Sequence, residues 1–297
     1  MQQKCYKTGM EIADSSLYYT LECGQTFRWR RTSDCSYFGI VEKNAFIISQ
    51  HGNILEITST ESDVEEWARR YFALDIDLDN ILLEIDRDEH IHKAIKSCRG
   101  LRILRQEAWE TLASYILSAN NNIPNIKRMV ENLSQRLGER REIEGYSGFT
   151  FPSPSAILKN KDIVNKCRLG FRCDYLIKAA EMIREERIEL VKISRLSYEE
   201  CREELMKIKG VGGKIADCVA LFSFGMYEAF PVDVWIRRII RNLYSSNREV
   251  GDKQIRHFAR EYFGRYCGYA QEYLYCHYRL NKPEGITSQT VEQAQGI

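Results

Sequence analysis

Hydrophobic and polar positions divide this chain into two parts with different periodicity. Between about residues 17 and 58, short runs rich in β-branched and aromatic residues alternate with turn signals, which predicts an antiparallel meander. The runs are Tyr37 to Val41, Ala45 to Ser49 and Ile54 to Thr58. Beyond the capping-box pattern that begins at Ser62, the period becomes helical almost to the end. We therefore predict an α+β protein, with an N-terminal antiparallel β-sheet domain over 1–95 and a mostly helical domain over 96–297.

A glycine turn stands out within the helical part. Ser197 and Glu200 form a capping-box pattern, so an amphipathic helix is predicted from about 198 to 208. Gly210 and Gly212 then allow left-handed backbone angles and a chain reversal into a second helix near Gly213. This is a helix-hairpin-helix over about 198–224, whose free backbone N–H groups suit a phosphate. The alternative at this point is an ordinary tight turn between two core helices.

Three residues in and after this hairpin are candidates for chemistry. Lys214 lies in the first turn of the second helix, where the helix dipole favours a neutral, nucleophilic amine, although most lysines are simply solvated. Cys218 lies four residues on and faces the same pocket, unless it is only a small apolar packing residue. Asp233 enters a helix predicted from Val234 to Leu243 and is a natural N-cap, which also fixes its carboxylate in one position.

Composition limits the partners and cofactors. The 297 residues carry a net charge of only +1, so any affinity for nucleic acid must come from a local basic face. The ten cysteines contain no Cys-x-x-Cys pair, and the five histidines form no ligand pattern, so neither zinc nor an iron–sulfur cluster is supported. No stretch is long and apolar enough for a membrane span, and residues 1–13 lack an apolar signal core. We expect an intracellular protein that needs no cofactor, located in the cytoplasm and nucleoid of a prokaryote or the nucleus of a eukaryote.

The order and spacing of several motifs resemble one known family. Gly210-Val211-Gly212, Lys214 and Asp233 resemble the helix-hairpin-helix, Gly-Pro-Asp superfamily of DNA glycosylases, and the lysine marks its bifunctional glycosylase/lyase type. Further segments narrow the resemblance to the 8-oxoguanine DNA glycosylase family over roughly residues 20–280: Cys23 to Trp29, Gly100 to Gln106, Ser118 to Ile123, Leu169 to Arg172, and Gly268 to Gln271.

This resemblance implies a reaction on duplex DNA that contains 8-oxoguanine. The lesion must be extruded before a side chain can reach it. Lys214 would attack C1′ and form a Schiff base, Asp233 would stabilise the cationic sugar, and β-elimination would cut the strand. Two alternatives are a monofunctional alkyl-base glycosylase, which would not need Lys214, and a non-catalytic hairpin module, which would need neither Lys214 nor a base pocket.

The resemblance also assigns binding roles. For the lesion, the carbonyl of Gly24 would accept from its N7–H, Gln271 would read its Watson–Crick edge, and Cys218 and Tyr275 would flank its faces. For the DNA, the resemblance implicates Asn120 as the residue inserted into the gap, Phe171 as a wedge, Arg172 at the orphaned base, and Gly210, Gly212 and Asn121 at the backbone. Without it, Phe171 and Arg172 would be interpreted as a core phenylalanine and a surface arginine. The carbonyls of Met206, Ile208 and Val211 are candidates for a monovalent cation, but no metal is required.

Two departures from the family pattern modify these expectations. Asn125 stands where eukaryotic members have an arginine, which predicts a relaxed preference for the base opposite the lesion. Trp235 stands where a histidine is expected, which removes one anticipated phosphate contact. We expect the protein to act as a monomer.

Overall fold

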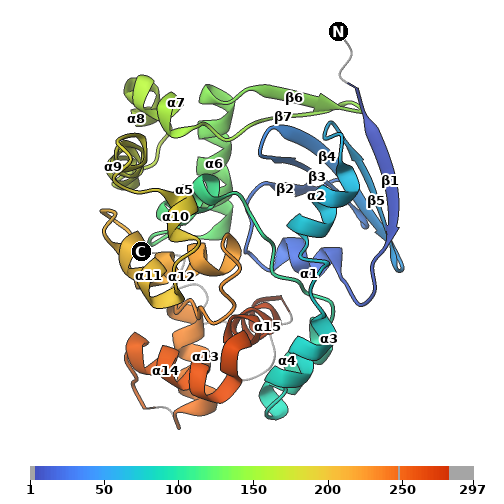
Figure 1. The fold of residues 1–297 in the computed structure, drawn as a ribbon, viewed down its shortest axis with the longest axis vertical. Helices are drawn as coiled ribbons and strands as arrows, with labels where there is room; N and C mark the ends of the chain where they lie inside the picture. The colour runs from blue at the N-terminus through green and yellow to red at the C-terminus, as the bar shows by residue number, and fades with distance from the viewer. Residues whose placement is uncertain (1–3, 247, 281–297) are drawn as a thin grey trace.

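A five-stranded antiparallel sheet forms the N-terminal part of the computed structural model, which describes residues 4–246 and 248–280 (Figure 1). The strands lie in the order β1-β5-β4-β3-β2. Their bounds are β1 (Tyr6–Glu11), β2 (Trp29–Arg31), β3 (Ser36–Val41), β4 (Asn44–His51) and β5 (Ile54–Ser59). The three predicted strands are thus confirmed as β3 to β5. The prediction missed the two edge strands, because β2 has only three residues and β1 is mostly polar.

Both faces of this sheet are covered, and the period of two along each strand decides which side chain meets which cover. Phe46 and Ile48 of β4 face an apolar cluster that includes α2 (Val64–Tyr71), where the rings of Phe46 and Trp67 stack with centroids 3.8 Å apart. Ala45 and Ile47 face the opposite side, against a second hairpin formed by β6 (Arg140–Ile143) and β7 (Tyr146–Phe149).

The β6–β7 hairpin is an element that the sequence prediction assigned to helix. Its two turn residues, Glu144 and Gly145, have φ of 44° and 84°, as a two-residue hairpin turn requires. A glutamate is an uncommon residue in the left-handed region, so the local turn signal was weak. A second correction concerns the start of α2, where Asp63 accepts a hydrogen bond from the Glu66 N–H and is the N-cap in place of Ser62.

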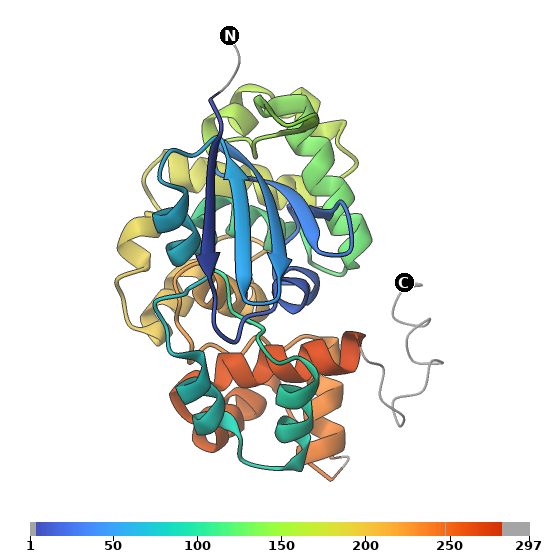
Figure 2. The same cartoon turned by 90° about the vertical axis from the view of Figure 1, so that its right-hand side faces the viewer.

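Helices make up most of the remaining described chain (Figure 2). They surround one large apolar cluster. α3 and α4 follow the sheet in sequence, yet they pack against α15 and belong to this helical cluster. No helix in the described ranges is long and apolar enough to cross a membrane. The bounds are α1 (Leu17–Glu22), α3 (Leu78–Ile85), α4 (Glu89–Ser97), α5 (Ala108–Leu117), α6 (Ile123–Leu137), α7 (Pro154–Lys159), α8 (Lys161–Asn165), α9 (Arg172–Arg184), α10 (Leu190–Ile193), α11 (Tyr198–Met206), α12 (Gly213–Phe222), α13 (Val234–Tyr244), α14 (Asp252–Phe263), the 3₁₀ turn η1 (Gly264–Tyr266) and α15 (Cys267–Leu280).

Candidate active site

The predicted helix-hairpin-helix is present as α11, a short turn and α12. Gly210 has φ of 89°, and a Cβ there would lie 2.4 Å from Cγ of Tyr175, so both backbone and packing require glycine. Gly212 differs from the expectation: its φ is −94°, and no atom lies within 4 Å of an added Cβ. This open position precedes the N-terminus of α12, which has no side-chain cap. The backbone N–H groups of that terminus can therefore be approached by an anion.

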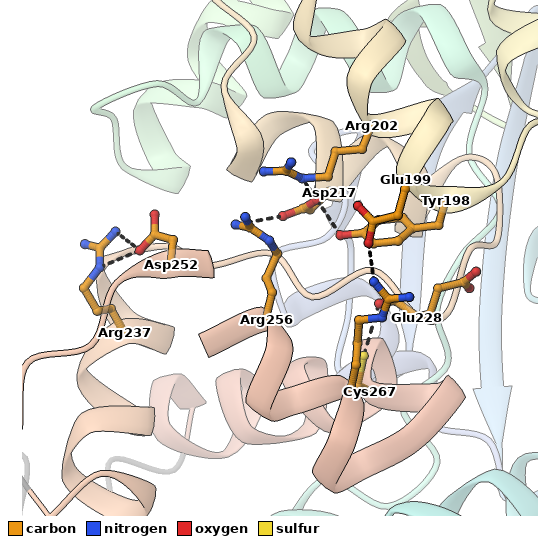
Figure 3. A network of polar contacts seen from close by, with 10 residues as sticks. Tyr198, Glu199, Arg202, Asp217, Glu228, Arg237, Asp252, Arg256 and Cys267 are labelled. Atoms are coloured by element: carbon orange, nitrogen blue, oxygen red, sulfur yellow. Dashed lines mark hydrogen bonds and ion pairs between the residues drawn. The ribbon is translucent and has the colours of Figure 1, made fainter. Parts of the chain in front are cut away.

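A buried ionic network holds α12 in place (Figure 3). Asp217 is fully buried, and its Oδ1 accepts hydrogen bonds from Tyr198 Oη at 2.8 Å and Arg202 Nε at 2.9 Å, both on α11. Arg256 of α14 approaches its Oδ2 at 3.9 Å. Because Asp217 lies between Lys214 and Cys218, these contacts from two other helices fix the orientation of the residues on either side of it.

Lys214 points from α12 towards α5. Its Nζ donates to Ser118 Oγ at 3.2 Å, and Ser118 in turn donates to the Tyr115 carbonyl at 2.7 Å. The same Nζ lies 4.9 Å from the centroid of the Tyr115 ring, whose face attracts positive charge. The amine is thus positioned by a hydroxyl and an aromatic face.

Asp233 is the N-cap of α13, as predicted, and its Oδ1 accepts from the Ile236 N–H at 2.8 Å. Burial raises the pKa of Asp233, while the Ile236 and Trp235 amides and the Lys214 charge oppose that rise. The carboxylate therefore has a fixed position and faces the Lys214 charge.

An open cleft of about 1280 Å³ brings these two residues together with most of the other predicted site residues. Counting Lys214 and Asp233, eleven predicted site residues line its wall: Gly24, Asn120, Asn121, Phe171, Arg172, Gly212, Lys214, Cys218, Asp233, Gln271 and Tyr275. The remaining hairpin positions are not among the residues that line it, namely Met206, Ile208, Gly210 and Val211. The Ile208 carbonyl accepts from the Val211 N–H at 3.0 Å.

Gly24 reaches the cleft from the sheet domain. Its φ is 110°, and a Cβ would lie 2.8 Å from Cδ1 of Ile123 and 3.3 Å from Nη1 of Arg279, so only glycine fits. The adjacent Gln25 belongs to the Cys23 to Trp29 segment and had no predicted role of its own. Its buried side chain donates to the Thr20 and Arg102 carbonyls and accepts from the Leu104 N–H at 2.8 Å. Gln25 thereby links the Gly24 turn to residues 101–106. This link explains why the Cys23 to Trp29 and Gly100 to Gln106 motifs occur together in a chain with this pocket.

One face of α15 supplies a further wall. Gln271 is 4% exposed, and Tyr275 follows one turn later on the same face. Across the cleft Cys218 is 2% exposed, and burial raises the pKa of its thiol to about 12, so it stays protonated at neutral pH.

Glu272, which was not predicted from the sequence, lies beside Gln271 in the same wall. This carboxyl is 3% exposed, and burial raises its pKa to about 7. Its spacing of three residues from Tyr275 was the available signal, because positions i and i+3 share a helix face.

A loop between α5 and α6 carries Asn120 at the mouth of the cleft. Asn120 is exposed and has φ of 47°, a conformation that asparagine tolerates better than most residues. Arg172 holds this loop, because its Nε donates to the Ala119 carbonyl and its Nη2 to the Asn120 carbonyl, each at 2.7 Å. The interpretation of Arg172 as a surface residue is therefore wrong: it is 8% exposed. The interpretation of Phe171 as a core residue is also wrong, since it is 54% exposed.

The neighbouring asparagines are occupied within the loop. Asn121 donates to the Leu117 carbonyl at 2.9 Å, and its Oδ1 accepts from the Asn122 N–H and from Asn125 Nδ2, the latter at 2.6 Å. Because these bonds use its side chain, Asn121 shapes the turn in this conformation and does not present its amide outward. Asn125 in turn accepts from Arg128.

Comparisons with known proteins agree with this fold and cleft. Residues 8–112 match the family model of the 8-oxoguanine DNA glycosylase N-terminal domain, and residues 113–265 match that of HhH-GPD superfamily base excision DNA repair proteins. The class defined by fold and site is therefore that of the helix-hairpin-helix DNA glycosylases. The chain belongs to the HhH-GPD superfamily of base excision DNA repair proteins and carries the N-terminal domain of its 8-oxoguanine glycosylase branch.

Individual relatives support the same assignment. The chain is 31% identical to a probable N-glycosylase/DNA lyase of Methanothermobacter thermautotrophicus over 70% of this chain and 72% of the relative. It is 32% identical to the N-glycosylase/DNA lyase of Saccharomyces cerevisiae over 82% and 72%. The structure of Clostridium acetobutylicum 8-oxoguanine glycosylase/lyase, solved with double-stranded DNA that has cytosine opposite 8-oxoG, superimposes with a TM-score of 0.86. It is 34% identical and covers 93% of this chain and 99% of that one.

Proposed function

We propose that this protein is a bifunctional DNA repair enzyme that excises 8-oxoguanine from duplex DNA and then cleaves the abasic strand. The observation that carries the proposal is the convergence of Lys214 and Asp233 with Gly24 and Gln271 in one cleft, although Gly24 and Gln271 are separated by almost 250 residues of sequence. A monofunctional alkyl-base glycosylase does not need Lys214, and a non-catalytic binding module does not need the cleft.

Lys214 is the proposed nucleophile. Its Nζ forms a bond to C1′ of the lesion nucleotide, while the bond from C1′ to N9 breaks and its electron pair leaves with the base, which takes up a proton. Ring opening then yields an iminium at C1′. Loss of the C2′ proton breaks the bond from C3′ to its oxygen, and the 3′ phosphate leaves by β-elimination. The Asp233 carboxylate stabilises the positive charge on the sugar during the first step, and the Tyr115 ring face does the same for the later iminium.

Base recognition begins with extrusion of the lesion. Asn120 fills the gap that the flipped nucleotide leaves, Phe171 wedges against the opposite strand, and Arg172 supports the Asn120 loop and contacts the orphaned base. The Gly24 carbonyl accepts from N7–H of 8-oxoguanine, a donor that guanine lacks. A buried carbonyl facing the N7 lone pair of guanine would be unpaired, which supports strong discrimination.

Several finer expectations complete the proposal. The open Gly212 position and the uncapped start of α12 bind a DNA phosphate. The preference for the opposite base is relaxed, because Asn125 is bonded to Asn121 within the loop. The protein works as a monomer in the compartment that holds the DNA.

Duplexes with 8-oxoguanine opposite each of the four bases test this function. We expect strand cleavage without added alkali, at rates within about tenfold of one another across the opposite bases. Lys214→Gln should abolish both excision and cleavage, whereas Lys93→Gln on α4, outside the cleft, should keep them. Intact 8-oxoguanine duplex after prolonged incubation with the wild-type protein would refute the function. A strict preference for cytosine would refute only the relaxed specificity.

A further inference from the structure

Besides Asp233, the cleft contains a buried carboxyl group for which the reaction above has no use. Glu272 lines the same wall as Gln271 and Tyr275, and it is 97% buried, with an exposed fraction of 3%. Its Oε2 is buried without a hydrogen-bond partner among the described residues. The Oε1 of its neighbour Gln271 is in the same situation. Two adjacent residues that line one cleft thus each carry a buried, unsatisfied acceptor oxygen.

Packing does not explain these two oxygens. Buried polar atoms in folded proteins almost always have partners, because an unsatisfied acceptor costs stability. The Cys23 thiol hydrogen-bonds the Glu272 carboxyl, yet Oε2 is still without a partner among the described residues. Asp233, Arg279 and Lys214 act on the carboxyl through their charges. Arg279 donates instead to the Glu22 carbonyl. The wall is therefore built for a ligand that brings its own donors.

A guanine-type base is such a ligand. Its Watson–Crick edge carries the N1–H and the exocyclic 2-amino group, which together offer three N–H donors. An adenine-type base presents an acceptor at N1 and lacks a 2-amino group, so in the same position it would leave both oxygens unpaired. We propose that Glu272 is a second reader of the lesion, whose carboxyl oxygen accepts a hydrogen bond from the 2-amino group while Gln271 takes N1–H. This inference rests on the proposed excision of 8-oxoguanine and specifies how the same site selects a guanine-derived base.

Removing one donor from the base and one acceptor from the protein tests this contact. The substrates are duplexes with 8-oxoguanine or 8-oxohypoxanthine, which lacks only the 2-amino group, each opposite cytosine. The variants are Glu272→Met, which has no carboxyl acceptor, and Glu272→Gln, which keeps an acceptor oxygen but cannot ionise. Glu261→Gln, at an exposed position on α14, is the matched control. Single-turnover excision rates are measured, together with cleavage of a preformed abasic site that carries no base.

The wild-type protein and Glu261→Gln should excise 8-oxoguanine roughly 10- to 100-fold faster than 8-oxohypoxanthine. Glu272→Gln should retain most of this ratio. Glu272→Met should bring it close to one by slowing excision of 8-oxoguanine, with cleavage of the abasic site within about threefold of wild type.

Other outcomes would overturn the inference in distinguishable ways. Equal wild-type rates on the two bases would exclude a contact with the 2-amino group, even if Glu272→Met failed to fold. An unchanged ratio in Glu272→Met, or a loss of the ratio in both Glu272 variants, would show that the carboxyl acts otherwise than as an acceptor. Absence of 8-oxoguanine excision by the wild-type protein would contradict the proposed function itself.

Discussion

Replacing Asp233 by asparagine separates the two tasks of this side chain. Asparagine caps helices as well as aspartate does, so the bond from the Ile236 N–H, now 2.8 Å, should persist. The negative charge beside Lys214 is lost. A carboxylate about 4 Å from a cationic sugar, at an effective dielectric constant of about 20, contributes about 4 kcal/mol. Its loss should slow excision by about 10³-fold.

Asp233→Ala provides the comparison, because it removes the cap as well as the charge. Loss of an N-cap costs about 1 kcal/mol, which should lower the melting temperature by about 2 °C for a chain of this size. The assay is single-turnover excision of 8-oxoguanine, with hot alkali used to reveal abasic sites, alongside thermal unfolding of both variants. An excision rate for Asp233→Asn within tenfold of wild type would refute the electrostatic role. Equal destabilisation by the two substitutions would refute the preserved cap.

Three further predictions concern the pocket and its support. Gly24→Ala should lower the free energy of unfolding in denaturant by about 1–2 kcal/mol, because alanine is strained at φ of 110° and meets Ile123. It should also reduce 8-oxoguanine excision more than abasic-site cleavage, and unchanged excision would contradict this. Arg172→Met should lose about 2–3 kcal/mol of stability, because it removes two charged hydrogen bonds to the Asn120 loop. It should also slow base flipping, measured with a fluorescent base analogue, and normal flipping would count against the support of this loop by Arg172. Glu272→Gln should match the wild-type melting temperature near pH 4.5 and exceed it increasingly up to about pH 7. The reason is that burial raises the pKa of Glu272 to about 7, so from about pH 4.5 to 7 the carboxyl ionises in the unfolded chain but stays protonated in the folded one, and the wild-type protein loses stability. Parallel pH profiles would contradict this prediction.

Local signals in the sequence were sufficient to place the proposed catalytic pair. The hairpin glycine at 210, the lysine that follows it and the capping aspartate at 233 all depend on residues within one or two turns, and each lies where it was predicted. The three central strands were equally accessible, because their alternation matches the two faces of the sheet.

The missed features depend on contacts between distant segments. Nothing near Arg172 in sequence indicates that its guanidinium holds the carbonyls of residues more than fifty positions earlier. Glu272 resembled an ordinary helical glutamate, and its burial depends on the packing of α15, which contacts α4, α13 and α14. The β6–β7 hairpin was hidden by its Glu-Gly turn. The monomeric state, the hairpin cation site and the preference for the opposite base are still predictions.

Borohydride trapping tests the central role of Lys214 most directly. Wild-type protein is mixed with an 8-oxoguanine duplex and sodium borohydride, which reduces an iminium to a stable amine, and peptide mapping locates the linked residue. We predict one covalent protein–DNA adduct at Lys214 that is absent in Lys214→Gln. Excision by the wild-type protein without any adduct, or an adduct that persists in Lys214→Gln, would contradict this mechanism.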